Sequence, residues 1–174
     1  GVRLADVLKA AGVKPSAVFT GNYGADRSLA DASKDALSRG VPIKKALDVN
    51  NLIVFAMDGQ PLPHVHGGPV RLIMPGWPGS VSSKWPTRIW LRDKVHDGPG
   101  MGGTSYRVAI NPMVPGDRPD EKNFRDLESM PVRSIITSPM NGASFGKDVR
   151  ELKLRGAAWA GDFRLEKRLP LAAG

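Results

Sequence analysis

The sequence predicts a domain of mixed helices and strands (α+β), and three features of its N-terminal part support this. Residues 2–11 carry apolar side chains at helical spacing. Continuous apolar runs at residues 52–57 and 70–74 are too short for helices and are typical of buried strands. The segments between and after these runs are rich in Gly and Pro, which predicts loops.

The N-terminal segment predicts a short amphipathic helix. Its apolar residues recur every three or four positions: Leu4, Val7, Leu8 and Ala11. Gly12 stands where a C-terminal cap belongs. Residues 17–20 then form a brief β-type run, and the glycines of residues 21–26 predict a loop.

A second short helix is predicted at residues 42–47, where Pro42 would occupy the first turn. The polar segment before it, residues 29–39, is ambiguous. The run at 52–57 predicts a buried strand that leads into a Pro- and Gly-rich segment, and residues 85–91 are strand-like again.

The segment after residue 57 predicts a loop that holds two histidines. An Asp-Gly pair at residues 58–59 predicts a turn. Pro61 and Pro63 disfavour helical geometry and remove backbone donors, so we expect His64 and His66 on a rigid extended loop.

The rest of this segment indicates a binding pocket. Gly67 and Gly68 allow the backbone to approach a bulky ligand closely, and Arg71 begins the next strand. A second loop, residues 75–84, adds short donors and a cation: Ser80, Ser82, Ser83 and Lys84. Together these residues predict a pocket for an anionic ligand with many acceptors.

The same residues carry a family resemblance. The string GQPLPHVHGGPVRLIMPGW, followed by SSKWPTRI, resembles the molybdopterin domain of the sulfite oxidase family, and among bacterial members the sulfite and sulfane dehydrogenases. The match runs from Val2 to about Pro139. It implies a sulfite-oxidase-type α+β molybdopterin-binding domain at 1–127, N-terminally incomplete. The first strands of an immunoglobulin-like β-sandwich dimerisation domain, C-terminally incomplete, would follow at 128–174.

The resemblance also implies site residues. His66 and Arg71 match the histidine and arginine of the family motif G-x-P-L-x-x-x-H-G-x-P-x-R, and the family's K-W loop falls on Ser82, Ser83 and Lys84. Tyr23 is nearest to an aspartate that contacts the cofactor in the family, with Asp26 close by. Tyr106 corresponds to a tyrosine that lines the substrate site.

Each of these residues also has a plainer interpretation. His66 would be a hydrogen-bonded loop residue, Arg71 and Lys84 would form structural salt bridges, Tyr23 would be a surface aromatic, and Tyr106 would anchor its loop. His64 does not match the family position. His96 lies in a charged segment that looks solvated, so we expect both to be ordinary residues.

Charge and cysteine content limit the alternatives. The net charge of +8 is spread along the chain, with no basic run or aromatic stacking platform, so a nucleic-acid partner is not expected. No apolar stretch is long enough to span a membrane. The chain has no cysteine, which excludes disulfides and iron–sulfur sites within it. The family holds its molybdenum through a cysteine upstream of the matched region.

The C-terminal part predicts β structure. Residues 131–139 and 156–161 are β-rich, and residues 149–154 alternate. Residues 112–126 predict a linker or a surface crossing. From Asp162 onward the sequence leaves the family pattern, which favours a fragment of a longer protein.

The resemblance implies a molybdenum-containing molybdopterin enzyme of sulfur metabolism. It would oxidise sulfite or protein-bound sulfane sulfur by oxygen-atom transfer and pass electrons to a c-type cytochrome, as a periplasmic homodimer, and this fragment alone would be inactive. Two alternatives stay open. One is a cofactor-free scaffold or interaction module with the same fold, and the other is a related molybdopterin reductase of a sulfoxide or nitrate.

Overall fold

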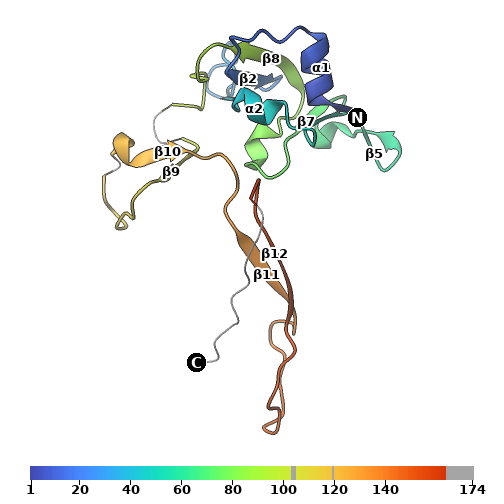
Figure 1. Ribbon diagram of the computed structural model, residues 1–174, viewed down its shortest axis with the longest axis vertical. Helices are drawn as coiled ribbons and strands as arrows, with labels where there is room; N and C mark the ends of the chain where they lie inside the picture. The colour runs from blue at the N-terminus through green and yellow to red at the C-terminus, as the bar shows by residue number, and fades with distance from the viewer. Residues whose placement is uncertain (103–104, 119, 164–174) are drawn as a thin grey trace. The chain divides into compact units, whose positions relative to one another are not determined.

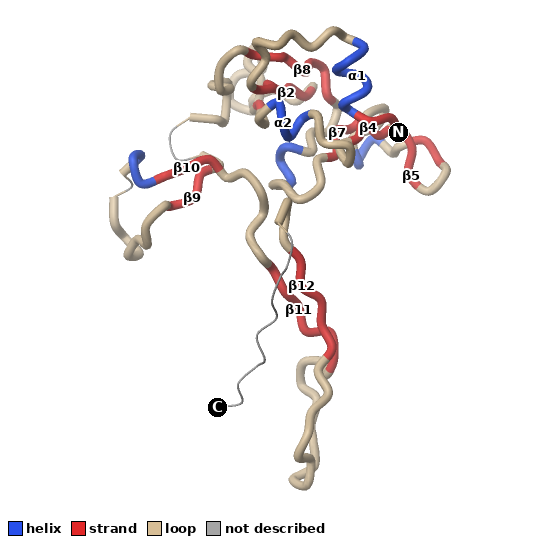
Figure 2. The backbone as a smooth tube through the Cα atoms, in the orientation of Figure 1, coloured by secondary structure: helices blue, strands red, loops and turns tan. Residues whose placement is uncertain are grey.

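The computed structural model describes residues 1–102, 105–118 and 120–163, and the chain divides into two compact units, 1–128 and 129–174. Strands dominate the described backbone and the helices are short (Figures 1 and 2). This division does not identify either unit, so the expected domains at 1–127 and 128–174 remain predictions. No helix of the described residues is long and apolar enough to cross a membrane.

The core of the first unit lies against an antiparallel sheet of order β1–β4–β7, formed by β1 (Val2–Arg3), β4 (Leu52–Val54) and β7 (Arg71–Ile73). Helix α1 (Leu4–Ala10) follows β1 directly and buries Leu4, Ala5 and Leu8. The predicted helix is therefore confirmed from residue 4 onward, but Val7 is 38% exposed and lies off the buried face. The core cluster consists of Leu4, Leu8, Val41, Ala46, Leu72, Met74 and Val81.

A second antiparallel sheet has the order β3–β2–β8 (Figure 1), with β2 at Phe19–Gly24, β3 at Ser38–Arg39 and β8 at Pro86–Arg92. The prediction of a loop at residues 21–26 was wrong, because β2 pairs with β8 as far as Gly24. Gly21 serves packing here and not a turn. A Cβ at this position would lie 2.6 Å from His96 Nδ1.

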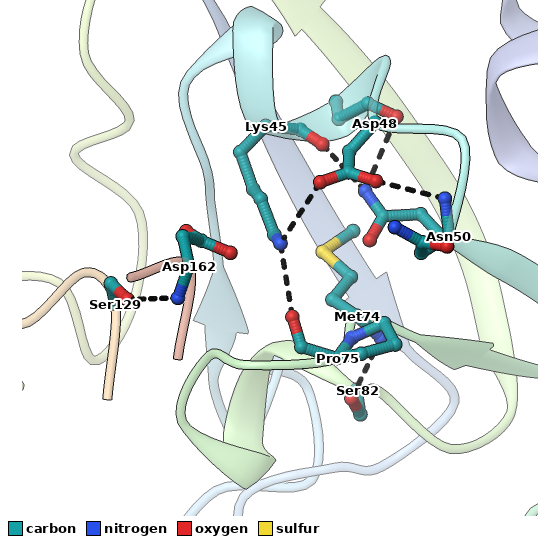
Figure 3. A network of polar contacts seen from close by, with 10 residues as sticks. Lys45, Asp48, Asn50, Met74, Pro75, Ser82, Ser129 and Asp162 are labelled. Carbon is teal, nitrogen blue, oxygen red and sulfur yellow. Dashed lines mark hydrogen bonds and ion pairs between the residues drawn. The ribbon is translucent and has the colours of Figure 1, made fainter. Parts of the chain in front are cut away.

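Helix α2 (Ile43–Ala46) begins after Pro42, and the apolar run that follows is interrupted at Phe55. Beyond the interruption, β5 (Ala56–Met57) and β6 (Gln60–Pro61) form a small hairpin. The side chain of Lys45 ties α2 to the loop after β7, because its Nζ donates to the Pro75 carbonyl at 2.9 Å and pairs with Asp48 (Figure 3).

The segment 112–126 was predicted to be a linker or a surface crossing, but its second half carries secondary structure. A 3-10 turn, η3 (Glu121–Asn123), leads into β10 (Phe124–Asp126), which pairs antiparallel with β9 (Arg107–Ala109). The Asp120 side chain accepts a hydrogen bond from the Lys122 backbone and caps the turn. Two further 3-10 turns, η1 (His64–His66) and η2 (Gly79–Val81), lie in the two predicted pocket loops.

The second unit contains an antiparallel pair, β11 (Arg133–Ser138) and β12 (Arg155–Trp159). The Asp162 backbone donates to Ser129 Oγ at 2.6 Å beyond this pair (Figure 3). The alternating residues 149–154 do not form the predicted strand, since their exposed side chains cover no second layer. The sequence from residue 164 onward lies outside the described residues. An immunoglobulin-like sandwich thus remains a prediction for this unit.

Candidate functional site

Four of the predicted site residues line one cavity of about 220 Å³ in the first unit: Arg71, Ser82, Ser83 and Lys84. The two pocket loops meet at this point because Arg71 and Lys84 form a β-bridge and Leu72 N donates to the Ser83 carbonyl. Ser80, a donor of the predicted pocket, and Asp26, which lies near the family's cofactor-contacting position, also line the cavity. Asn22 and Trp85, which the sequence analysis did not select, line it as well.

The loop that contains His64 and His66 presents its backbone carbonyls, and not its side chains, to Arg71 and Lys84. Residues 64–66 form the turn η1, so the prediction of an extended loop was wrong. The turn exposes three consecutive carbonyls, and each accepts a hydrogen bond from a side chain of the facing strand or loop. Trp85 Nε1 donates to residue 64 at 3.1 Å, Lys84 Nζ to residue 65 at 2.6 Å, and Arg71 Nη1 to residue 66 at 3.3 Å.

Glycine is needed where this turn meets the second loop. Gly67 has a φ of +103°, and a Cβ there would lie 3.0 Å from Cβ and Cγ of Lys84. The close approach that the doubled glycines predict is therefore toward the protein itself: toward Lys84 at Gly67 and toward the Leu62 carbonyl at Gly68. His66 itself is exposed, and its imidazole does not line the cavity. Its contribution in this structure is the carbonyl that receives Arg71.

Arg71 keeps an unused donor at the cavity. Its Nη1 is bound to the His66 carbonyl, while its Nε is buried and has no hydrogen-bond partner among the described residues. No carboxylate pairs with Arg71 in the described ranges, so the plainer interpretation of a salt bridge finds no support. A buried donor without a partner is costly unless a ligand satisfies it.

Asn22 is a second buried polar side chain at this cavity. Neither its amide nitrogen nor its amide oxygen has a partner in the part of the chain that the structure describes, although the residue is only 1% exposed. Its neighbour Tyr23 points to the other face of β2, where the ring lies 5.6 Å from His96 and 3.9 Å from the Arg88 guanidinium carbon. Tyr23 does not line the cavity, and its role remains a prediction.

Ser82 and Ser83 are held in different ways. Ser82 Oγ accepts a hydrogen bond from Met74 N at 3.0 Å and so closes the loop over β7 (Figure 3). Ser83 accepts a hydrogen bond from Leu72 N through its backbone carbonyl, and the residue lines the cavity.

A shallow, mostly apolar groove of about 550 Å³ adjoins the cavity, since Asp26 and Trp85 line both. The ring of His64 packs against Trp85 there, with 5.1 Å between the centroids and 32° between the ring planes. The cavity and groove together present polar donors at one end and an aromatic surface at the other. This combination suits a ligand with both a charged group and a planar ring system.

Tyr106 lines a different, small cavity, together with Arg39, Trp77 and Asp126. Its ring is 3.6 Å from the guanidinium carbon of Arg39. The Ser80 hydroxyl, followed by the Arg39 guanidinium, lowers the pKa of Tyr106. Ser80 also lines the 220 Å³ cavity, but its Oγ is buried and forms no hydrogen bond with the described residues.

His96 is not the solvated residue that its charged neighbours predict. It is 2% exposed, with Nδ1 2.9 Å from Arg92 Nη1 and Nε2 2.7 Å from Ser38 Oγ. Because the arginine can only donate, Nδ1 is the acceptor and Nε2–H donates to the serine, which in turn donates to the Pro99 carbonyl. Burial, followed by the charge of Arg92, lowers the pKa of His96 and keeps the ring neutral.

Comparison with known proteins identifies the class of domain that this fold and cavity form. Residues 1–100 match the family model described as the oxidoreductase molybdopterin binding domain.

Similar proteins narrow this class. The chain is 34% identical to the mitochondrial sulfite oxidase of Drosophila melanogaster over 98% of its own length, and 30% identical to an NADH nitrate reductase of Ulva prolifera over 94%. In structure it resembles the sulfane dehydrogenase SoxCD from Paracoccus pantotrophus, with a TM-score of 0.64, 30% identity and 92% of this chain covered. The chain belongs to the sulfite oxidase family of molybdopterin-binding domains.

The chain spans only part of these relatives. It covers 30% of the Drosophila sulfite oxidase, 20% of the Ulva nitrate reductase and 37% of the SoxCD chain. The expected cofactor, molybdopterin with molybdenum, is the cofactor of this family.

The residues at the cavity fit the organic part of this cofactor. The unpartnered Arg71 Nε and Asn22 amide, with Lys84 beside them, offer donors to phosphate and pterin oxygens and an acceptor to pterin nitrogens. The described residues contain no group of three His, Cys, Asp or Glu side chains placed to hold a metal, and the sequence has no cysteine. The residues at the cavity would hold the pterin.

Proposed function

We propose that this chain holds the molybdopterin of a sulfur-oxidising enzyme in the cavity lined by Arg71, Ser83 and Lys84. The observation that carries the proposal is the pair of buried polar groups without partners, Arg71 Nε and the Asn22 amide, at one cavity wall. Family membership supports the choice of ligand. A molybdopterin has anionic and hydrogen-bonding groups that could serve as the missing partners of these side chains.

The carbonyls of η1 prepare the cations for this role. Arg71 and Lys84 each spend one donor on a carbonyl of residues 64–66, which fixes the position of the positive charge. An arginine has five N–H donors and a lysine three, so donors remain for an anionic ligand. Cations held in place before binding lose little side-chain entropy when the ligand arrives.

In the complete protein, the reaction would be oxidation of sulfite or protein-bound sulfane sulfur by oxygen-atom transfer, with electrons passed to a c-type cytochrome. When bound, the molybdenum cofactor supplies the oxygen transfer and accepts the two electrons. Tyr106 would lie on the substrate side, where its hydroxyl donates to an oxyanion or moves a proton. The basic balance of the chain would favour anionic substrates through long-range attraction.

A nitrate reductase activity is the second candidate, because a nitrate reductase is among the relatives that cover most of this chain. Both activities use the same cofactor and differ in the direction of oxygen transfer. Steady-state assays of the complete protein with sulfite and cytochrome c, and with nitrate and a reductant, separate the two. A protein that takes up no pterin at all would instead be the scaffold alternative.

The compartment and assembly are also proposals. Family resemblance favours a periplasmic homodimer in which the second unit begins an immunoglobulin-like dimerisation domain. The animal relatives are named mitochondrial sulfite oxidases, so a different compartment is known among similar proteins. Fractionation of cells and the mass of the complete protein in solution test these two points.

The cofactor site is tested by pterin content. We expect Arg71→Met and Lys84→Met in the complete protein to lower the molybdopterin bound per polypeptide at least tenfold, which corresponds to losing about 1.4 kcal/mol or more of binding energy for each cation. Mass spectrometry of the purified protein measures the pterin. Arg125→Met and Lys44→Met are matched controls, because both side chains are exposed and outside the cavity. Full pterin content in both cavity variants would remove these residues from the site.

A further inference from the structure

Arg39 is a buried cation with no acidic partner in the described part of the chain. It is 5% exposed, and its Nη1 donates to the carbonyls of Ser38 at 2.7 Å and Gly100 at 3.0 Å. None of the ion pairs among the described residues includes it, and its Nε is buried without a hydrogen-bond partner. Two carbonyls compensate a buried guanidinium only in part, so a further electron-rich partner is expected.

The ring of Tyr106 is that partner. The guanidinium carbon of Arg39 lies 3.6 Å from the ring centroid, which is close for a cation–π contact. Tyr106 has a φ of +55°, a conformation that is rare for an aromatic residue, and Leu127 N donates to its carbonyl at 2.8 Å. The ring is therefore held by a cation on its face and by a fixed backbone.

Tyr106 is also coupled to a residue of the candidate cofactor site. Ser80 lines the cavity that contains Arg71 and Lys84, and its Oγ is buried and forms no hydrogen bond with the described residues. Ser80, followed by Arg39, lowers the pKa of the phenol. The phenol thus responds both to the buried cation on its ring and to a residue of the cavity.

The other charged groups near Tyr106 are acidic or already paired. Asp126 and Glu128 line the small cavity that contains the tyrosine, and Asp126 pairs with Arg107 at 3.1 Å. Carboxylates beside a phenol oppose its ionisation. Arg39 is consequently the cation that counteracts them at the ring.

We propose that Arg39 is a positioning residue for Tyr106: its guanidinium holds the face of the ring and stabilises negative charge on the phenol. The proposal rests on the proposed function in one respect, namely that Tyr106 faces the substrate. The placement and acidity of the hydroxyl are properties of this chain alone and can be measured without cofactor.

Tyrosine titration gives a direct test, because the chain contains only two tyrosines, Tyr23 and Tyr106. The chain is labelled with ¹³Cζ-tyrosine, its two resonances are followed by NMR against pH, and Tyr106→Phe assigns them. We expect Arg39→Met to raise the pKa of Tyr106 toward the ordinary value of about 10, and Arg39→Lys, which keeps the charge, to raise it less.

Two further variants keep the test decisive. Arg39→Gln keeps a polar side chain but removes the charge, so it should also raise the pKa of Tyr106, even if Arg39→Met fails to fold. Arg88→Met is the matched control, because it removes an arginine from the ring of the other tyrosine, Tyr23, and should leave the pKa of Tyr106 unchanged. An unchanged pKa of Tyr106 in folded Arg39→Met or Arg39→Gln protein, or an equal shift in Arg88→Met, would overturn the proposal.

The complete protein separates this inference from the proposed function. With sulfite as substrate, we expect Arg39→Met to lower kcat roughly 10-fold to 100-fold and move the pH–rate profile upward while pterin content stays full. Arg39→Lys should recover part of the rate. A parent protein without sulfite activity would refute the proposed function and leave the titration result standing. An active parent whose pH profile does not move in Arg39→Met refutes the role of Arg39.

Discussion

Replacement of His96 by alanine should strongly destabilise the first unit, although its charged neighbours in the sequence suggest a solvated residue whose loss would cost little. Three glycines pack so closely against His96 that none has room for a Cβ. A Cβ at Gly21 would lie 2.6 Å from His96 Nδ1, one at Gly40 would lie 2.8 Å from His96 Cβ, and one at Gly98 would lie 2.6 Å from His96 Cε1. The ring joins β8 to β3 through its contacts with Arg92 and Ser38.

The expected cost follows from these contacts. Loss of the hydrogen bond from a charged arginine and of the bond to Ser38 costs about 2 to 3 kcal/mol together, because both partners stay buried. The cavity left by the imidazole adds roughly 1 to 2 kcal/mol, since the glycines around it have no side chains to fill the space. We therefore expect the free energy of unfolding to fall by about 4 kcal/mol.

Urea unfolding of the 174-residue chain at pH 7.5, followed by tryptophan fluorescence, measures this change. His66→Ala is the matched control. Its imidazole is exposed, so we expect a change below about 0.5 kcal/mol. A loss below about 1 kcal/mol for His96→Ala would contradict the role assigned to the buried ring.

The pH dependence of stability tests the same ring in another way. The pKa of His96 is lowered in the folded chain, so the unfolded chain binds a proton more readily, near pH 6.5. The stability from the neutral ring is complete above pH 6.5 and is lost as pH falls toward the lowered folded pKa, at about 1.4 kcal/mol per pKa unit. Arg92, Arg88 and Asp97 also act on the ring. His96→Ala should abolish the slope just below pH 6.5, and an unchanged slope would assign it to other groups.

Two further predictions concern packing and are measured by the same urea titration. Leu72→Ala should cost about 3 kcal/mol, because the side chain is 0% exposed in the core cluster, whereas Leu29→Ala, at a fully exposed position, should change little. Gly98→Ala should cost about 1 to 3 kcal/mol through overlap with the His96 ring, whereas Gly79→Ala, where a Cβ meets nothing within 4 Å, should be neutral. Equal effects within either pair would refute the packing argument.

Periodicity in the sequence predicted the elements that bury one regular face. Helix α1 and the strands β7 and β8 lie within two residues of the predicted segments, and β4 begins where predicted but ends three residues early. It failed at residues 21–24, because Gly21, which packs against His96, and Gly24, which packs against the Lys84 carbonyl, look like loop residues in a sequence. It also failed at 149–154, where alternation does not guarantee a pairing partner.

The sequence likewise predicted some residues of the candidate site and missed others. The resemblance directed attention to Arg71 and Lys84, which the structure brings to one cavity. Asn22 was missed because a single amide in a glycine-rich segment carries no distinctive pattern. His96 was missed because the charges around it suggested solvent, although one of them, Arg92, is turned inward to hold it.

The hydrogen bonds to residues 64–66 have a consequence for how such a sequence can diverge. The side chains at 71, 84 and 85 bond to backbone carbonyls, which every amino acid supplies alike. The flanking side chains have other roles, since His64 packs on Trp85 and His66 matches a motif position of the family, but Val65 is exposed. An inventory of natural variants should thus record wide diversity at 65 beside near-invariance at 71, 84 and 85.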